Sequence, residues 1–400
     1  MTGVAKLKDR IADQRFRDEG AVVAEALAAV SLDATARARV TAAATELVET
    51  LRQMSDPGIM EQFLATYGLS TEEGVALMCL AEAYLRTPDA PTVDALIRDK
   101  IGSSNWRSHL GETDSFLVNA STWALMLTGR VLGDAGMDEQ ELTGFMAQAV
   151  RRLGEPVVRA AIEQAMKILG RQFVLGAGIT DALKRAEGME KKGYTYSYDM
   201  LGEAARTAAD ARRYFLSYSS AISTIAKQAV HDDVLANPGI SVKFSALHPR
   251  YEYVQRKRVL EELVPRVSAL AEHARAAGMC FTIDAEEADR LELSADVIEA
   301  VARNPDFVGW DGFGVVVQAY SKQAPAVLDW LYALAGELGR RFTVRLVKGA
   351  YWDQEIKNAQ MLGLPNYPVF TRKASTDVSY LRCAEKLFDQ ADRIYPQFAT

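Results

Sequence analysis

From about residue 155 onward, short β-rich runs alternate with amphipathic helical runs, and no other feature of the sequence constrains the fold as strongly. The expected strands cover residues 195–201, 240–247, 280–286, 312–320, 342–349 and 394–399. Between two of them, Leu263, Val267 and Leu270 recur at helical spacing. Strands that alternate with helices are typical of βαβ units, in which the strands run parallel. The sequence therefore predicts an α/β fold, specifically a (βα)8 TIM-like barrel.

The predicted barrel is incomplete within these 400 residues. A closed barrel of this kind needs eight units and about 250 residues, whereas the pattern provides six strands in roughly the last 200. An open sheet edge would leave backbone groups without partners. We therefore expect residues 155–400 to be the first six βα units of a barrel that belongs to a longer protein.

The sequence ahead of the barrel reads as helical in two parts. Residues 55–154 predict an α-helical domain, in which Ser70 and Glu73 form a capping box, and we expect packing rather than chemistry there. Residues 1–54 form an Ala-rich helical arm with Asp33 as the expected N-cap of its second run. Because the arm has few large apolar residues, it must pack on something else, such as a second subunit.

Composition excludes several classes of function. The net charge of −7 and pI near 5.4 argue against nucleic-acid binding as a whole-chain property, and residues 1–54 balance eight basic against eight acidic residues. The cysteines Cys79, Cys280 and Cys383 are far apart and the histidines lack ligand spacing, so we expect no metal site. The absence of an apolar run of about 18 residues and of a signal peptide predicts a cytoplasmic protein.

Active sites of such barrels lie where the strands end. The polar residues late in the expected strands are Asp199, Lys243, Ser245, Asp284, Glu286, Gln318, Arg345, Lys348, Tyr351 and Thr400. A lysine in an apolar strand is costly to bury unless it is paired, so we expect Lys243 to face Asp284 across the barrel mouth. That pair can hold a polar substrate group, or it can be a structural ion pair. Strand alternation also predicts that Asp284 and Glu286 share one face.

Three further features suit a bound cofactor. The Gln318 amide can donate to and accept from a heterocycle edge, although a satisfied core glutamine is equally compatible. Residues 345–352 combine two cations, two aromatic side chains and Gly349, which would let the backbone approach a ligand. Arg345 would stabilise charge on an electron-accepting ring. Residues 371–376 fit phosphate binding at a helix N-terminus or a plain helix cap.

These motifs resemble a known family. Residues 198–203, 240–251, 283–290, 345–352 and 395–400 are similar to the proline dehydrogenase domain of proline utilization A. The resemblance covers about 170–400 strongly and 60–150 more weakly, through residues 72–80. It implies a barrel that oxidises L-proline to Δ1-pyrroline-5-carboxylate and passes electrons through FAD to a membrane quinone, the first step of proline catabolism to glutamate.

The resemblance also implies roles for individual residues. The catalytic residues would be Lys243, Asp284, Arg345 and Tyr351. FAD would be held by Gln318, Arg345, Lys348, Gly349, Ala350, Tyr351, Trp352, Thr371, Arg372, Lys373, Thr376, Ala399 and Thr400. The implied protein is cytoplasmic, with peripheral contact at the inner membrane, and assembles as a homodimer or higher homo-oligomer through residues 1–54.

The sequence departs from the family pattern in three ways. A late Tyr-x-x-Arg-Arg motif, whose arginines pair with the substrate carboxylate, is absent, so we expect residues 1–400 alone not to form a competent enzyme. The NAD-dependent aldehyde dehydrogenase module of the family would lie beyond residue 400. The N-terminal ribbon-helix-helix of some members is also absent, which, with the neutral arm, predicts no nucleic-acid partner.

Two other functions stay open on the residues alone. Lys243 beside Asp284 would suit a Schiff-base aldolase. Alternatively, the chain is a non-enzymatic scaffold on a degenerate barrel, against which the intact set of Lys243, Asp284 and Arg345 argues. Flavin absorbance of the purified protein distinguishes both from the flavoenzyme.

Overall fold

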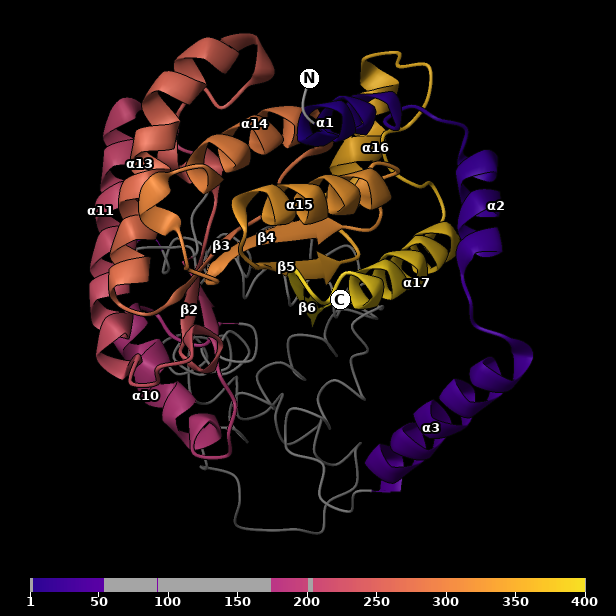
Figure 1. The fold of residues 1–400 in the computed structure, drawn as a ribbon, viewed down its shortest axis with the longest axis horizontal. Coiled ribbons are helices and arrows are strands. Elements are labelled where there is room, and N and C mark those ends of the chain that lie inside the picture. Colours follow the sequence, from indigo (N-terminus) through magenta and orange to yellow (C-terminus); the bar gives the residue numbers. More distant parts are fainter. Residues whose placement is uncertain (1–2, 54–91, 93–173, 201–203, 400) are drawn as a thin grey trace, which may run out of the picture. The chain divides into compact units, whose positions relative to one another are not determined.

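The computed structural model describes residues 3–53, 92, 174–200 and 204–399 (Figure 1). The chain divides into two compact units, one made of Met1–Ala36 with Ala186–Thr400 and the other of Arg37–Arg185. The helices predicted in 55–154 and the capping box of Ser70 lie outside the described residues. The domain boundaries expected at residues 54 and 154 therefore stay a prediction.

A parallel sheet of six strands forms the centre of the first unit (Figure 1). The strands are β1 Ser197–Asp199, β2 Gly239–Val242, β3 Cys280–Ile283, β4 Phe313–Gln318, β5 Phe342–Val347 and β6 Ile394–Phe398. They lie side by side in chain order, and each pairs with the next in parallel. The predicted alternation of parallel strands with helices is confirmed.

Helices connect the strands and cover the sheet. The first unit contains α1 Gly3–Asp13, α2 Glu19–Ala29, α11 Ala208–Ile225, α12 Phe244–Leu247, α13 Arg256–Ala276, α14 Leu291–Ala302, α15 Ala324–Leu338, α16 Trp352–Met361 and α17 Lys373–Asp389. Short 3-10 turns are η2 Ala226–Gln228, η3 Val234–Ala236, η4 Tyr253–Gln255, η5 Ala288–Arg290 and η6 Pro305–Phe307. Two more helices, α3 Ala34–Gln53 and α10 Ile179–Glu190, cross from one unit into the other.

The second strand is shorter than predicted. We expected it to cover 240–247, but β2 ends at Val242 and the short helix α12 follows Lys243. Beyond the strand, the backbone N–H of Ser245 donates to Glu286 Oε1 at 3.0 Å rather than to a neighbouring strand. Lys243 is therefore the first residue beyond the strand, and Ser245 lies in the helix.

The two faces of the sheet differ in chemistry. Val315 and Val317 face α14 and α15, because together with side chains of both helices they line one cavity. The same side of the sheet carries Phe281 and Phe313, which are fully buried and paired in register. The opposite side carries small polar residues, and the ladder aligns Ser241, Thr282, Gly314 and Thr343 across four strands. We call this second side the inner face.

The inner face is strongly concave. Arg345 on β5 donates hydrogen bonds to Ser241 on β2 and to Ser197 on β1. In a flat sheet β5 and β2 would lie three strand spacings apart, about 14 Å. One side chain can join these strands only because the sheet curls round its inner face, as a barrel wall does.

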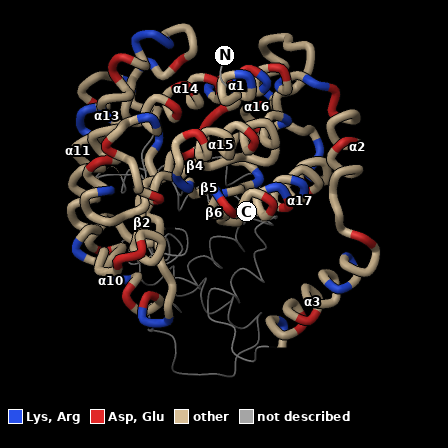
Figure 2. Tube along the Cα trace, in the orientation of Figure 1, with Lys and Arg blue, Asp and Glu red and all other residues tan. Residues whose placement is uncertain are grey.

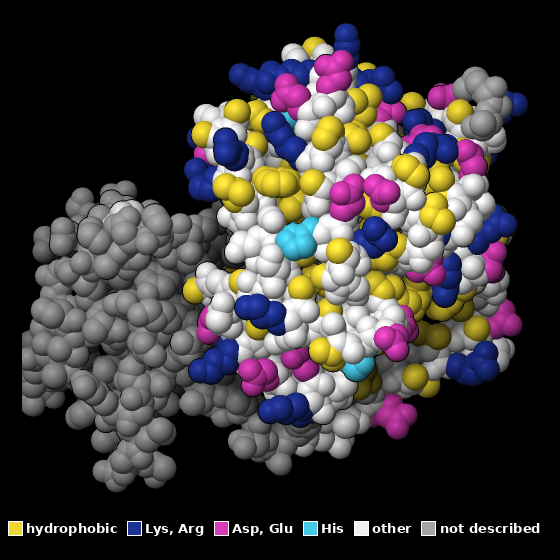
Figure 3. Space-filling model, turned by 60° about the vertical axis from the view of Figure 1, so that its left-hand side comes forward, with side chains coloured by type: hydrophobic (Ala, Val, Ile, Leu, Met, Phe, Trp, Pro, Cys, Tyr) yellow, Lys and Arg dark blue, Asp and Glu magenta, His cyan; other side chains and the backbone are white. Residues whose placement is uncertain are grey.

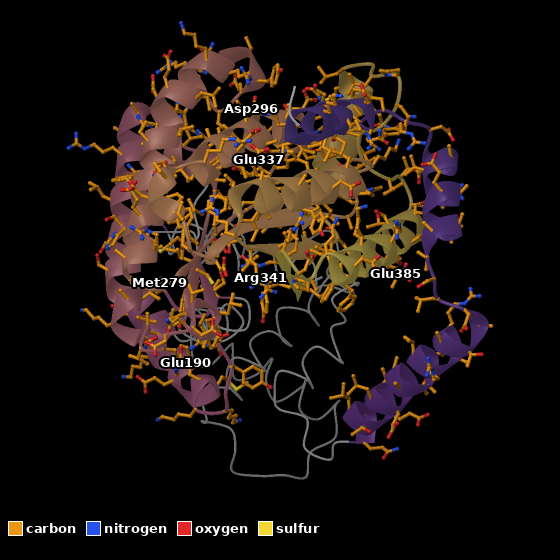
Figure 4. All side chains as sticks on the ribbon, in the orientation of Figure 1. Glu190, Met279, Asp296, Glu337, Arg341 and Glu385 are labelled. Carbon is orange, nitrogen blue, oxygen red and sulfur yellow. The ribbon has the colours of Figure 1, made fainter. Side chains whose placement is uncertain are left out.

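The first two helices pack on the same chain, α1 against α15 and α2 against α17 (Figure 1). Lys8 of α1 forms ion pairs with Asp296 at 3.0 Å and Glu299 at 2.6 Å, both on α14, and Asp296 is labelled in Figure 4. The backbone N–H of Ser31 donates to Glu385 of α17, also labelled there, at 2.9 Å. The expected packing partner of the early helices is thus, in part, the sheet unit itself.

The third helix begins as predicted. The backbone N–H of Ala36 donates to the Asp33 carboxylate at 2.7 Å, which confirms Asp33 as the cap of α3. Along the described helices, charges of both signs are interspersed (Figure 2), and on the face in Figure 3 they mix with hydrophobic side chains. None of the described helices is long and apolar enough to cross a membrane.

Candidate active site

A lysine and two carboxylates meet where the first three strands end. Lys243 follows β2 and Asp284 follows β3, directly after the paired residues Val242 and Ile283. The Lys243 Nζ lies 2.9 Å from Asp284 Oδ2 and 3.2 Å from Asp199 Oδ2 at the end of β1. The side chains of Lys243 and Asp284 are only 16% and 13% exposed, so this ion pair is largely removed from water.

Arg345 reaches the same cluster from β5. Its Nη1 lies 3.6 Å from Asp284 Oδ1, and it donates to Ser241 Oγ at 3.1 Å and, through Nη2, to Ser197 Oγ at 3.0 Å. The structure therefore brings Lys243, Asp284 and Arg345 together, as the strand-end argument expected. We name Asp199, Lys243, Asp284 and Arg345 the charge cluster.

The charge cluster keeps its lysine protonated. Burial alone would lower the pKa of Lys243, but the carboxylates of Asp284 and Asp199 outweigh it and raise the pKa well above its usual value. Burial and the neighbouring Asp284 raise the pKa of Asp199. A Schiff-base lysine must lose its proton to attack a carbonyl. This environment therefore disfavours the aldolase and favours a lysine that binds through its charge.

Gln318 joins two of the loops that follow the strands. Its Nε2 donates to the Glu286 carbonyl oxygen at 2.9 Å, and its Oε1 accepts from the Ala350 backbone N–H at 3.0 Å. This buried amide thus ties the loop after β3 to the loop after β5. Both ends of the amide are thus paired within the chain, as in the satisfied core glutamine that the sequence also allowed.

The expectation that Asp284 and Glu286 share one face stays a prediction. Strand β3 ends at Ile283, so the alternation that the argument used no longer applies beyond it. Glu286 is buried, accepts from the Ser245 backbone and forms an ion pair with Arg290 at 3.0 Å. Burial raises the pKa of Glu286.

The loop after β5 holds two aromatic residues at the start of α16. Gly349 has φ +146°, and a Cβ there would collide with the ring of Tyr320. A glycine is therefore required here by packing within the chain, and the ligand approach that we expected stays a prediction. Tyr351 occupies the N-cap position of α16, and Trp352 donates from Nε1 to the Phe370 carbonyl at 2.8 Å while 42% of it stays exposed.

Residues 371–376 lead into α17, with Arg372 at its N-cap position and Thr376 buried. Lys348 and Lys373 approach Asp377 of this helix at 2.7 Å and 2.8 Å. The expected gathering of cations at a helix start is present, but Asp377 partly neutralises it. Hydrogen bonds from Lys348 and Lys373 lower the pKa of Asp377.

A second carboxylate at this helix start comes from α2. Glu19 accepts the backbone N–H of Thr371 at 2.9 Å and its hydroxyl at 2.8 Å. Burial alone would raise the pKa of Glu19, but these hydrogen bonds outweigh it and lower the pKa. No local pattern predicts this contact, since the two residues are 352 positions apart.

Ala399 and Thr400 end the expected cofactor set. The Ala399 backbone N–H donates to Leu346, and its carbonyl accepts from Tyr380 at 3.1 Å. Thr400 lies outside the described residues. We predicted Asp199 at a strand end but did not place it with Lys243, Asp284 and Arg345, and we did not predict Ser197 or Ser241. Alternation would have found all three, because Ser241 lies two residues before Lys243 and Ser197 two before Asp199.

Comparison with protein families decides the classification. Residues 182–400 match the family model described as proline dehydrogenase. The chain belongs to the proline dehydrogenase family. The predicted α/β, TIM-barrel-like fold class is confirmed by this match together with the parallel sheet.

Several relatives of known name are similar to this proline dehydrogenase family member. The bifunctional protein PutA of Salmonella typhimurium is 51% identical over 361 residues, which are 89% of this chain and 27% of that protein. PutA of Rhizobium meliloti is 51% identical over 358 residues. A crystal structure of a Bradyrhizobium japonicum proline utilization A variant is 49% identical, with a TM-score of 0.69, and covers 96% of this chain and 38% of that one. The chain thus spans about a quarter of the length of these curated relatives.

A second family match corrects one expectation. Residues 59–173 match a model described as the DNA-binding domain of proline dehydrogenase. The prediction of no nucleic-acid partner relied on the charge of the whole chain and on residues 1–54, and a local binding surface can exist on an acidic protein. The match falls mainly on residues 55–154, to which we had assigned packing alone, and it leaves the exclusion of a nucleic-acid partner without support.

Proposed function

We propose that this chain carries the FAD-dependent oxidation of L-proline to Δ1-pyrroline-5-carboxylate, with electrons passed to a membrane quinone, as the first step of proline catabolism to glutamate. The observation that most supports the proposal is the charge cluster at the strand ends of a proline dehydrogenase family barrel. An amino acid carries both an ammonium and a carboxylate, and the cluster presents groups of both signs to such a substrate.

The residues of the cluster have separable tasks. The protonated Lys243 attracts the substrate carboxylate, while Asp284 orients Lys243 and attracts the positively charged ring nitrogen. Tyr351, at the start of α16, is the fourth proposed catalytic residue. FAD, when bound, supplies the two-electron acceptor, and the Arg345 guanidinium stabilises negative charge that develops nearby.

The donors near α17 fit an anionic dinucleotide. Lys348 and Lys373 bring positive charge to the first turn of this helix, where the helix dipole also favours an anion. Arg372 lies beside them at the N-cap position. The half-exposed ring of Trp352 offers a flat surface whose orientation is fixed by its bond to Phe370. The remaining FAD contacts are proposed at Gln318, Arg345, Gly349, Ala350, Tyr351, Thr371, Thr376, Ala399 and Thr400.

We further propose that the protein is a cytoplasmic homo-oligomer that contacts the inner membrane peripherally. Supporting the self-association, α3 exposes Val40, Leu47, Val48 and Leu51 at helical spacing. For the barrel domain, residues 155–400, we do not propose the NAD-dependent second step of the family.

The deciding experiment is an absorbance spectrum of the purified full-length protein that contains residues 1–400, recorded anaerobically before and after L-proline is added. We expect flavin bands that bleach with L-proline but not with D-proline, and reduction of a quinone analogue in turnover. A protein that stays colourless after incubation with FAD and does not reduce dye with proline contradicts the proposal. Borohydride trapping of Lys243 with a keto substrate would instead support the aldolase.

A further inference from the structure

Two serines on neighbouring strands hold the guanidinium of Arg345. Ser197 on β1 and Ser241 on β2 accept from Nη2 and Nη1 at 3.0 Å and 3.1 Å, and their hydroxyl oxygens lie 3.1 Å from each other. Because each hydroxyl can accept from Arg345 while one donates to the other, the three hydrogen bonds can form at the same time. We call Ser197 and Ser241 the serine pair.

The serine pair, more than Asp284, fixes the position of Arg345. The nearest guanidinium nitrogen is 3.6 Å from Asp284, beyond a normal hydrogen bond, whereas the Lys243 ammonium lies 2.9 Å from the same carboxylate. Asp284 is therefore bound mainly to Lys243. The two contacts of Arg345 within hydrogen-bond distance that cross to other strands are those to the serine pair.

The sheet itself sets the spacing of the serine pair. Ser197 aligns with Gly239, and Asp199 aligns with Ser241, so the two serines lie diagonally on adjacent parallel strands of the inner face. Ser241 is buried, at 1% exposure, while Ser197 is exposed. A rigid strand pair thus presents two acceptors to a planar, forked donor, which suits guanidinium geometry.

We propose that Ser197 and Ser241 are positioning residues, which hold the Arg345 guanidinium where it stabilises charge on the electron acceptor. This inference rests on the proposed function. If it is correct, loss of one hydroxyl frees the guanidinium to move and weakens that stabilisation. Because the two hydroxyls act through Arg345, the rate of flavin reduction should fall while the KM for proline changes little.

The test uses Ser197→Ala, Ser241→Ala and the double variant, with Thr282→Val as the control. Thr282 is a buried hydroxyl of the same inner face, one strand further from β1, and Arg345 donates to the serine pair rather than to it. We expect each serine variant to lower kcat about fivefold, the value of one hydrogen bond. The flavin midpoint potential should become more negative, the double variant should exceed either single one, and FAD content should be unchanged.

A second measurement needs no flavin. Phenylglyoxal modifies accessible, mobile arginines, and mass spectrometry of the peptide that contains Arg345 reports its rate of modification. We expect the serine variants to be labelled faster than the parent protein and the Thr282→Val variant. Because Ser197 is exposed, its alanine variant should fold normally, and circular dichroism will check this.

The outcomes separate the two proposals. If the parent protein neither binds FAD nor oxidises proline, the proposed function fails, while the labelling rates still decide whether the serine pair holds Arg345. If the parent protein is active but potential, kcat and labelling rate are the same in all serine variants, the positioning role is overturned.

Discussion

The two faces of one sheet use opposite chemistry. On the helix-covered side, Phe281, Phe313 and Phe342 are fully buried, and the rings of Phe313 and Phe342 pack edge to face with centroids 5.7 Å apart. On the inner face the corresponding layer is made of hydroxyl groups and ends in four charged side chains. Residues that alternate along a single strand thus belong either to the core or to the site.

One short strand can therefore contribute to both stability and function. Each large apolar side chain on the covered side contributes about 1.5–3 kcal/mol on burial. The inner face has no such gain, because Lys243 and Asp284 must first be taken out of water and a buried ion pair often only breaks even. We therefore expect substitutions of the buried apolar residues on the covered side to reduce stability, and those of the charged residues on the inner face to reduce activity.

The largest expected effect is on the covered side. Phe281→Ala should lower the free energy of unfolding by about 3–5 kcal/mol, because it removes a fully buried ring and leaves a cavity. Urea denaturation followed by circular dichroism will measure it. The matched change on the next residue, Thr282→Val, should cost only about 0.5–1.5 kcal/mol. Equal losses at the two positions would show that the faces do not differ in this way.

The next effect is on the inner face. Asp284→Asn removes the charge that holds Lys243, and we expect proline oxidation to fall by about 10²–10³-fold, as for other preorganised polar groups. Steady-state kinetics will measure the loss, and the flavin spectrum will report cofactor content. Asp296→Asn, which removes a carboxylate paired with Lys8 far from the cluster, is the control and should be fully active. Loss of flavin in the Asp284 variant would mean that the residue serves cofactor binding instead.

The periodicity of the apolar residues and the positions of the strand ends predicted the parts of the molecule that depend on local sequence. The six strands follow from β-rich runs, and the meeting of Lys243, Asp284 and Arg345 follows because parallel strands end at one edge. Even there the details depended on tertiary contacts. Lys243 lies beyond its strand, and Ser245 of the helix that follows binds Glu286, a contact between segments 41 residues apart.

The unpredicted parts of the site depend on packing between distant segments. Glu19 reaches Thr371 only because α2 lies against α17, and nothing in the local sequence of either residue encodes that approach. Gly349 looked like a ligand contact, yet the ring of Tyr320 occupies the space beside it. Residue spacing does not specify whether a glycine or an amide faces a ligand or a neighbouring side chain. That is decided by the three-dimensional arrangement.

The smallest expected effect concerns the buried carboxylate behind the inner face. Because burial raises the pKa of Glu286 in the folded protein, folding favours its protonated form. Its contribution to stability is fully present below the unfolded pKa, near 4.3, and is lost as pH rises through the folded pKa. The Glu286→Gln variant does not titrate there, so the stability of the parent protein relative to this variant should decrease as pH rises from about 4.

Urea denaturation of both proteins between pH 4 and 8 will test this. Asp377→Asn gives a control of opposite sign. Hydrogen bonds from Lys348 and Lys373 lower the pKa of Asp377, so its contribution is present above the unfolded pKa and is lost as pH falls. If the stability of the parent protein relative to the Glu286→Gln variant instead increases as pH rises, the ion pair with Arg290 outweighs burial. Burying polar groups on this side of the sheet is then less costly than the difference between the two faces implies.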